Sequence, residues 1–324
     1  MKPTSTRPMQ RRTGLLLILI ALPLVVMLST APTASAQVCD FLLLTTQAEV
    51  DAVSCSSVTF NLNIAGAGGD ISDLSPLSSV TSVGGSLGIQ QTTLLTNLDG
   101  LGGITSVEGE LFIHNNSALT NVDGLAALTS LGANLSFLLA VLTIDNNDAL
   151  TNLDGLAALT LVGTSPGQSL NILNNAVLTN LDGLGCITSF GGNLFINNNA
   201  VLTNLQGLAA VTSVGRALQI TNNDALTNLD GLAAVTSVER DLQIESNATL
   251  TEFCGLFPLL DASGLVGIYT VADNATNPTE AEILAGGACP VNSGPSLSPG
   301  GIAILLTLLG AIAYWRLRQS VSAT

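Results

Sequence analysis

The amino-acid sequence predicts a mainly β protein: a right-handed parallel β-solenoid with coils of about 24 residues and short helical turns, plus apolar helices at its N- and C-terminal ends. The first observation is a recurring Leu-Thr-Asn-Leu-Asp-Gly-Leu segment. Its fourth residue is Leu98, Val122, Leu153, Leu181, Leu205 or Leu229, with degenerate copies at Leu74 and Phe253. Insertions of about seven and about four residues lengthen the third and fourth intervals. The second observation is a Leu-x-Ile pattern once per repeat. Repeats of this length bury their apolar residues against neighbouring repeats, so no coil folds alone.

Residues 1–36 have the three parts of a secretory signal peptide. Basic residues from Lys2 to Arg12 precede an apolar run at residues 14–28, and small residues follow at Ala34 and Ala36. We therefore predict cleavage between Ala36 and Gln37 and export of the chain, and we exclude this segment from the fold.

Residues 37–290 are predicted to form one solenoid of about nine coils. Leu194 and Ile196 alternate with Phe195 and Asn197, the period of a strand with one buried face. The same Leu-x-Ile pattern recurs at Leu111/Ile113, Leu142/Ile144, Leu170/Ile172, Leu218/Ile220 and Leu242/Ile244. One strand per coil predicts a parallel sheet.

Polar residues repeat in three columns. Two asparagine columns contain Asn97 and Asn116, and we expect both to stack as ladders that satisfy buried backbone groups. Asp99 and its equivalents precede glycine, where a carboxylate suits a turn or a helix cap. The alternatives are a calcium-binding column or paired catalytic carboxylates. A structural role is favoured, because catalysis needs one site whereas this aspartate recurs in Asp99, Asp123, Asp154, Asp182 and Asp230.

The charge distribution limits the classes of ligand that the predicted solenoid could bind. The predicted solenoid holds all 23 acidic residues but only Arg216 and Arg240 as cations, a net charge of about −21. Nucleic acids and anionic lipid surfaces require a cationic footprint, so the negative charge disfavours both as partners. Solubility is the simplest role for such an acidic body.

Five cysteines in an exported chain invite disulfide formation. Cys39 and Cys55 flank the first coil and Cys254 and Cys289 flank the last, so each pair would close an end that has no covering neighbour. Cys186 is left over. It occupies the position of Ala210 and Ala234 in later coils, which we interpret as a small inward slot with an inert buried thiol.

Residues 291–299 form a predicted linker, and residues 300–324 a transmembrane or sorting segment. Its apolar run of about fourteen residues, Ile302 to Trp315, needs flanking residues to span a bilayer, and Arg316 and Arg318 would stay cytoplasmic. Pro295-Ser296-Leu297-Ser298-Pro299, the apolar run and the final arginines resemble bacterial C-terminal sorting signals of the PEP or IPTL type. Gly300-Gly301 stands where a tryptophan is typical of the IPTL type. The resemblance implies an envelope sorting protease as a partner.

The repeats themselves resemble receptor L-domains, relatives of leucine-rich repeats. The resemblance rests on the Leu-x-Ile strand followed by Asn-Asn, the Leu-Thr-Asn-Leu-Asp-Gly-Leu turn and the Thr-Ser-Val-Gly-Gly approach to the next strand. It spans residues 38–290, and Cys39, Cys55 and Cys254 fit the cystine-bounded ends of that family. It implies an extracellular recognition or envelope role at the cell surface, and no ligand-contact residue is carried over.

Enzymatic motifs are scarce. His114 is the single histidine, and no nucleophile motif or phosphate-binding glycine loop is present in the sequence. We expect a non-catalytic protein without a cofactor, with calcium as the open alternative. A carboxylate-based glycan hydrolase ranks third among the functions.

Binding is expected where the repetition fails. Phe112, His114, Leu173 and Phe195 are predicted to point outward from the sheet without recurring in other coils. Scattered exposed apolar residues are common, but a contact patch is the functional alternative. The insertions near residues 137–141 and 164–168 are further candidates. The leading hypothesis is surface-anchored recognition or adhesion with a protein or glycan ligand, and the alternative is a structural envelope protein.

Overall fold

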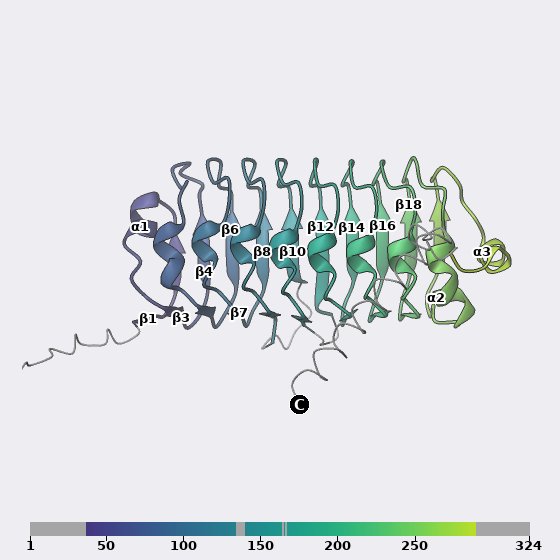
Figure 1. The fold of residues 1–324 in the computed structure, drawn as a ribbon, viewed down its shortest axis with the longest axis horizontal. Coiled ribbons are helices and arrows are strands. Elements are labelled where there is room, and N and C mark those ends of the chain that lie inside the picture. Colours follow the sequence, from purple (N-terminus) through teal and green to yellow (C-terminus); the bar gives the residue numbers. More distant parts are fainter. Residues whose placement is uncertain (1–36, 134–139, 164, 166, 290–324) are drawn as a thin grey trace, which may run out of the picture. The chain divides into compact units, whose positions relative to one another are not determined.

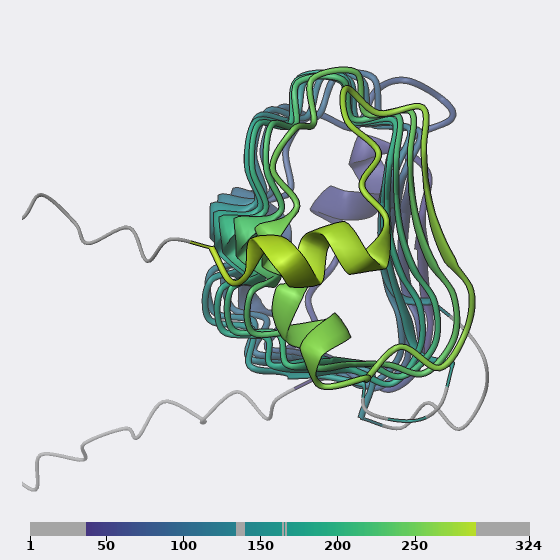
Figure 2. The same cartoon turned by 90° about the vertical axis from the view of Figure 1, so that its right-hand side faces the viewer.

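The computed structural model describes residues 37–133, 140–163, 165 and 167–289, and all of them belong to one compact unit. The predicted signal peptide, the linker and the apolar segment at residues 300–324 lie outside the described residues. Within the described part, the chain is a parallel β-solenoid (Figure 1). Successive coils stack so closely that their outlines superimpose when viewed end-on (Figure 2).

One wall of the solenoid is a ten-stranded parallel sheet with one strand per coil. Four leucines on successive strands are register partners: Leu111, Leu142, Leu170 and Leu194. The two longer coils therefore do not change the pairing of the main strands at this position. The strands are β2 (Leu42–Leu44), β4 (Leu62–Ala65), β6 (Leu87–Gln90), β8 (Leu111–His114), β10 (Ala140–Asp145), β12 (Ser169–Leu173), β14 (Leu194–Asn197), β16 (Leu218–Thr221), β18 (Leu242–Glu245) and β19 (Tyr269–Ala272).

A second line of two-residue strands precedes the main strands. It forms a six-stranded and a three-stranded parallel sheet. The break falls between β11 and β13. The strands are β1 (Val38–Cys39), β3 (Ser57–Val58), β5 (Ser82–Val83), β7 (Ser106–Val107), β9 (Ser130–Leu131) and β11 (Leu161–Val162), then β13 (Ser189–Phe190), β15 (Ser213–Val214) and β17 (Ser237–Val238).

The wall opposite the ten-stranded sheet is a stack of 3₁₀ turns built from the Asp-Gly-Leu segment (Figure 2). A Cβ atom at Gly100 would overlap the carbonyl group of Leu74 in the preceding coil, and the equivalent glycines face the same contact. The glycine is therefore required by close coil stacking. The turns are η1 (Ser75–Ser79), η2 (Asp99–Leu101), η3 (Asp123–Leu125), η4 (Asp154–Leu156), η5 (Asp182–Leu184), η6 (Gln206–Leu208), η7 (Asp230–Leu232) and η8 (Cys254–Leu256).

Three short α-helices interrupt the repetition at the ends of the described unit: α1 (Gln47–Asp51), α2 (Phe257–Asp261) and α3 (Glu280–Gly286). Capping boxes start two of them. The Thr46 hydroxyl accepts from the Glu49 N–H and the Thr279 hydroxyl from the Glu282 N–H, while each glutamate accepts from the backbone of its threonine. These helices cover the core where coils lack a neighbour, as terminal caps of a repeat protein must.

The interior is one continuous aliphatic core in which each coil contributes the same positions. The Asn116 column runs through it, and Asn116, Asn147, Asn175, Asn199, Asn223 and Asn247 are fully buried. Each of these amide oxygens accepts the backbone N–H of the equivalent residue in the preceding coil, for example Asn175 N to Asn199 Oδ1 at 3.2 Å. The predicted ladder is confirmed for this column.

The expectation for the Asn97 column was wrong. Asn97 is partly exposed, and its Oδ1 accepts the N–H of Asp99 two residues on, at 3.1 Å. The equivalents Asn121, Asn152, Asn180, Asn204 and Asn228 make the same turn within their own coils. They shape the entry to the 3₁₀ turn one coil at a time instead of linking coils.

Candidate functional site

The outward side chains of the ten-stranded sheet form two rows, which we call the sheet face. The first row is Leu43, Asn63, Gly88, Phe112, Thr143, Asn171, Phe195, Gln219, Gln243 and Thr270. The second row is Ala65, Gln90, His114, Asp145, Leu173, Asn197, Thr221, Glu245 and Ala272. These rows follow from the period of two along each strand and the unbroken parallel register.

The four residues predicted for binding all lie on this face, and each is half-buried. Phe112 and His114 share β8, with ring centroids 5.9 Å apart. Leu173 on β12 and Phe195 on β14 are on neighbouring strands but in different rows. The structure thus brings the residues together in two pairs, which β10 separates.

The Phe112 ring lies across the neighbouring strand. A Cβ atom built on Gly88 would overlap Cε2 and Cζ of Phe112, and Gly88 is buried although it belongs to an outward row. The ring therefore covers the backbone of β6 where a side chain is missing. The side chain is half-buried, so part of the ring remains accessible to solvent.

A chain of amide hydrogen bonds continues the face towards the C-terminal coils. Asn197 Nδ2 donates to Gln219 Oε1 at 3.1 Å, and Gln219 Nε2 donates to Gln243 Oε1 at 2.8 Å. Gln243 Nε2 then donates to the Glu245 carboxylate at 2.7 Å. These contacts hold three neighbouring strands' side chains flat against the sheet. The sequence placed these residues outward but did not predict their linkage, which depends on rotamers.

A second polar line borders the sheet face where the strands end. Asn174 Nδ2 donates to Asp145 Oδ1 at 2.8 Å, and Asn198 Nδ2 donates to Asn174 Oδ1 at 2.8 Å. Asn174 and Asn198 have φ of +54° and +59°, the left-handed region that asparagine tolerates well. The two residues of the Asn-Asn pair thus have different structural roles. The first adopts the left-handed conformation that turns the chain, and the second belongs to the buried asparagine ladder.

Two acceptors on the sheet face have no hydrogen-bond partner among the described residues, Asn63 Oδ1 and Asn171 Oδ1. Both belong to the first row, as do Phe112 and Phe195. Asn171 donates its Nδ2 to Thr143 Oγ1 at 3.4 Å, which leaves the oxygen as the unused half of the amide. Both oxygens are buried, and a buried polar atom without a hydrogen bond lowers the stability of the fold.

The two insertions that were expected to take part in binding lie partly outside the described residues. Residues 134–139, 164 and 166 lie outside the described residues, but their flanks are structural. Val141 is buried in the core, and Gln168 is almost fully buried with its Nε2 donating to the Gly132 carbonyl at 3.2 Å.

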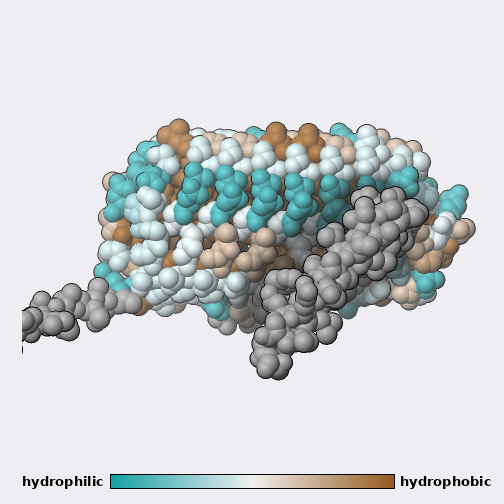
Figure 3. Space-filling model, in the orientation of Figure 1, coloured by the Kyte–Doolittle hydropathy of each residue, from teal (hydrophilic) through white to brown (hydrophobic). Residues whose placement is uncertain are grey.

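The acidic column occupies the wall of 3₁₀ turns, away from the sheet face. Each aspartate is the first residue of its turn, where a carboxylate favours the positive end of the short helix. On that wall a hydrophilic band runs from coil to coil (Figure 3). Gln206 interrupts the column between Asp182 and Asp230.

Disulfides join Cys39 to Cys55 and Cys254 to Cys289, with Cα atoms 5.8 Å and 4.7 Å apart. These are the pairs favoured by their position at the two ends of the solenoid. The interpretation of Cys186 was wrong: its side chain is exposed, and Ala210 and Ala234 are also partly exposed. The position follows the 3₁₀ turn on the outer surface, where a small side chain is tolerated but no inward slot exists.

Among the described residues, Asp230, Cys254 and Cys289 form the one cluster with metal-ligand spacing. Both sulfur atoms are committed to the disulfide, and the Asp230 Oδ1 atom lies 3.1 Å from Cys289 Sγ. A disulfide sulfur offers no thiolate, so this arrangement does not suit a cation.

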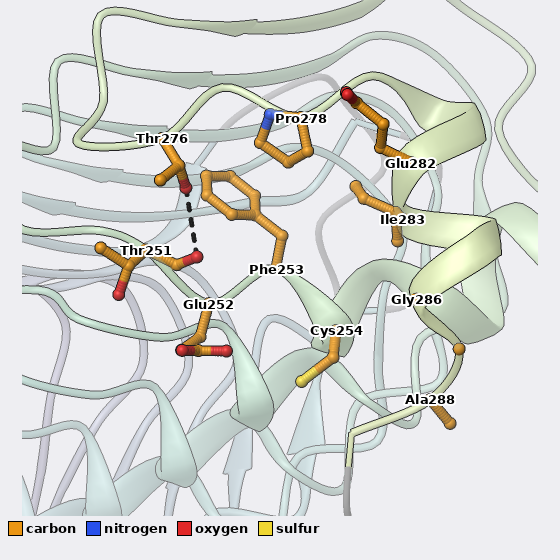
Figure 4. Close-up of a pocket in the computed structure, with 11 residues that line it drawn as sticks. Thr251, Glu252, Phe253, Cys254, Thr276, Pro278, Glu282, Ile283, Gly286 and Ala288 are labelled. Atoms are coloured by element: carbon orange, nitrogen blue, oxygen red, sulfur yellow. Dashed lines mark hydrogen bonds between the residues drawn. The ribbon is translucent and has the colours of Figure 1, made fainter.

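A cavity of about 310 Å³ separates the last coil from α3 (Figure 4). Phe253 and Ile283 point into this space from opposite sides, and Pro278 closes it above the phenylalanine ring. Two carboxylates line it, but that of Glu282 accepts the Thr279 N–H at 2.8 Å, and this bond lowers the pKa of Glu282. The cavity is therefore a gap under a capping helix with one free-standing acidic side chain, Glu252.

No family model matches the chain, and no curated protein matches it. None of the helices in the described part of the chain is long and apolar enough to cross a membrane.

Proposed function

We propose that this protein is an exported, non-catalytic recognition or adhesion protein that binds an extracellular protein or glycan through the sheet face. The observation that carries the proposal is the placement of Phe112, His114, Leu173 and Phe195 on one outward face, although none of them belongs to a structural column. Partly exposed apolar side chains on an otherwise polar sheet are typical of contact surfaces.

The proposed location is the cell surface. Two disulfides fit an oxidising, extracellular environment. The resemblance to receptor L-domains and the C-terminal sorting signal support the same location, with residues 300–324 as the anchor and an envelope sorting protease as its processing partner. Mass spectrometry of the chain recovered from cell envelopes tests this part, because processing would remove the C-terminal residues.

Attachment of the full chain to cells tests the recognition role. Phe112→Ala together with Phe195→Ala should abolish attachment and leave the circular dichroism spectrum unchanged. Leu94→Ala with Val201→Ala is the matched control, because these exposed apolar residues, 52% and 38% accessible, lie outside both rows of the sheet face. Unchanged attachment by the double phenylalanine variant would contradict the proposal.

A structural envelope role is the second candidate, and the first coil favours it. Val38, Phe41, Leu43 and Phe60 are all more than half exposed there. Among the described strands, β2 pairs with β4 alone and so presents a free edge. Exposed apolar residues at a free strand edge promote association. If this candidate holds, Leu43→Asp should weaken self-assembly in sedimentation velocity experiments, whereas Leu94→Asp, which alters an equally exposed leucine, should not.

A further inference from the structure

We infer that the ligand of the sheet face is an extended, uncharged glycan that crosses the strands with its sugar units in step with the coils. This inference rests on the proposed function and specifies the chemistry of its ligand. It draws on the pose of one ring, the polar groups around it and the spacing of the coils.

The pose of Phe112 suits a sugar. Its ring tip lies over Gly88 and the side chain is half-buried, so part of the aromatic surface is accessible to a ligand. The C–H-rich side of a pyranose packs flat on an aromatic face, since the ring face carries negative and the C–H groups positive partial charge. Phe195 supplies a second aromatic position in the same row.

The polar groups of the face also suit hydroxyl partners. The two rows contain eight amide or hydroxyl side chains from Asn63 to Gln243 among the apolar ones, and neither row contains lysine or arginine. Amides both donate and accept, as sugar hydroxyls do.

Charge narrows the class of glycan. The described solenoid carries a large excess of acidic residues, so a polyanionic polysaccharide would be repelled at long range. Arg216 and Arg240 precede β16 and β18 and lie outside both rows. An uncharged chain incurs no such repulsion.

The spacing supplies a geometric match. Neighbouring strands of a sheet are about 4.8 Å apart, close to the advance per unit of an extended β-linked pyranose chain. Three strand steps separate Phe112 from Phe195, or about 14 Å. A chain running along the first row would therefore place sugars on both rings, with two units over Thr143 and Asn171 between them. The longer coils do not disturb this match, because the one register shift lies before Leu142 and the strands from β8 to β14 pair regularly from that residue on.

Titration calorimetry of the full chain with β-1,4-linked glucose oligomers, from cellobiose to cellohexaose, tests the inference. Affinity should rise steeply until the oligomer reaches both rings, at about four units, and then level off. Maltohexaose, whose α-linkages coil the chain, should bind at least about tenfold more weakly than cellohexaose. Equal affinity for every oligomer, or for the two hexaoses, would overturn the match between sugars and coils.

Three substitutions locate the site. Phe112→Ala and Phe195→Ala should each weaken cellohexaose binding about tenfold, whereas Phe60→Ala, which removes an exposed phenylalanine outside the face, should not. Gly88→Ala should weaken binding as much as Phe112→Ala, because the new Cβ displaces the ring while keeping it in the chain. Circular dichroism of each variant confirms folding. Binding that survives all three changes on the face would place the glycan elsewhere and refute the inference.

The outcomes separate this inference from the proposed function. If the double phenylalanine variant loses cell attachment but cellohexaose and chitohexaose both fail to bind the wild type, the face recognises a protein, and the glycan inference is wrong while the recognition role stands. If chitosan binds and chitohexaose does not, simple charge attraction explains the binding, and the inference is again wrong.

Discussion

At the scale of single residues, the two asparagine columns look alike in the sequence but contribute differently to the stability of the fold. Asn199 is fully buried, and its Oδ1 accepts the N–H of Asn175, while its Nδ2 donates to the carbonyls of Ile172 and Asn197. Asn204 instead makes its backbone contact within its own exposed turn. A repeat pattern reports that a residue is required in every coil. It does not report whether the side chain points in or out, and this is why the sequence supported a ladder for both columns.

The difference between the columns predicts that substitutions in them reduce the stability of the protein by different amounts. Asn199→Ala leaves the buried N–H of Asn175 without a partner, at a cost of about 1–3 kcal/mol, and removes the Nδ2 bonds to two carbonyls, so we expect a loss of about 2 kcal/mol or more. Asn204→Ala should cost less than about 1 kcal/mol, because water replaces the lost contact. Urea unfolding curves measure both values. Equal losses would show that the buried ladder contributes no more than the exposed turn.

Glu110 predicts a dependence on pH. Burial raises the pKa of its carboxyl above the ordinary value of 4.5. The folded state therefore binds this proton more tightly than the unfolded state, so the penalty is absent at low pH and grows as pH rises through the raised folded pKa. Glu110→Gln should raise the thermal midpoint at pH 7 and leave it unchanged at pH 3. Calorimetry at the two pH values checks this, and the reverse order would contradict the burial of the charge.

At the scale of elements, the repeating pieces could be predicted and the unique ones could not. Leu194 and Ile196 identified their strand because the same period recurs in eight coils. The helices α1 and α3 occur once and are five and seven residues long, too short to show an apolar period. A local signal was nevertheless present: Thr46 with Glu49 and Thr279 with Glu282 both follow the capping-box spacing. Phe112 was predicted to point outward, but the pose of its ring depends on Gly88 in the neighbouring coil, which no local pattern reveals.

The 3₁₀ turns predict opposite effects for two glycine substitutions. At Gly183 a Cβ would overlap the Leu153 carbonyl of the preceding coil, so Gly183→Ala should cost about 1–3 kcal/mol or more by overpacking. At Gly102 the nearest atom to such a Cβ is the Asp99 oxygen at 3.5 Å, and alanine already occupies the equivalent position in Ala126. Gly102→Ala should be neutral, or stabilising by up to about 1 kcal/mol. Thermal unfolding of both variants provides the measurement, and a destabilised Gly102→Ala variant would contradict this view of the turn.

At the scale of the whole molecule, the period alone was sufficient to predict the parallel sheet and the continuous core. This is because a solenoid consists of contacts between neighbouring coils, and those contacts are set by columns that the sequence displays directly. The sheet face is different. The residues that we propose for recognition do not recur, so their spacing across the sheet became visible once the register from β8 to β14 was known.

The equivalence of the coils makes a strong prediction about deletion. Removing residues 203–226 joins Leu202 to Thr227, which restores the Leu-Thr-Asn-Leu-Asp-Gly-Leu segment and brings the strand of one coil beside that of the next but one. We expect a folded protein with an unchanged circular dichroism signal per residue. Its denaturant m-value should fall by about one tenth, because one of ten main strands is lost. Removing residues 203–214, half a period, is the control, since it brings a strand against a 3₁₀ turn and should prevent folding of the C-terminal coils. If the two deletions behaved alike, stability would not reside in the contacts between neighbouring coils, and the sheet face would lose its rigid support.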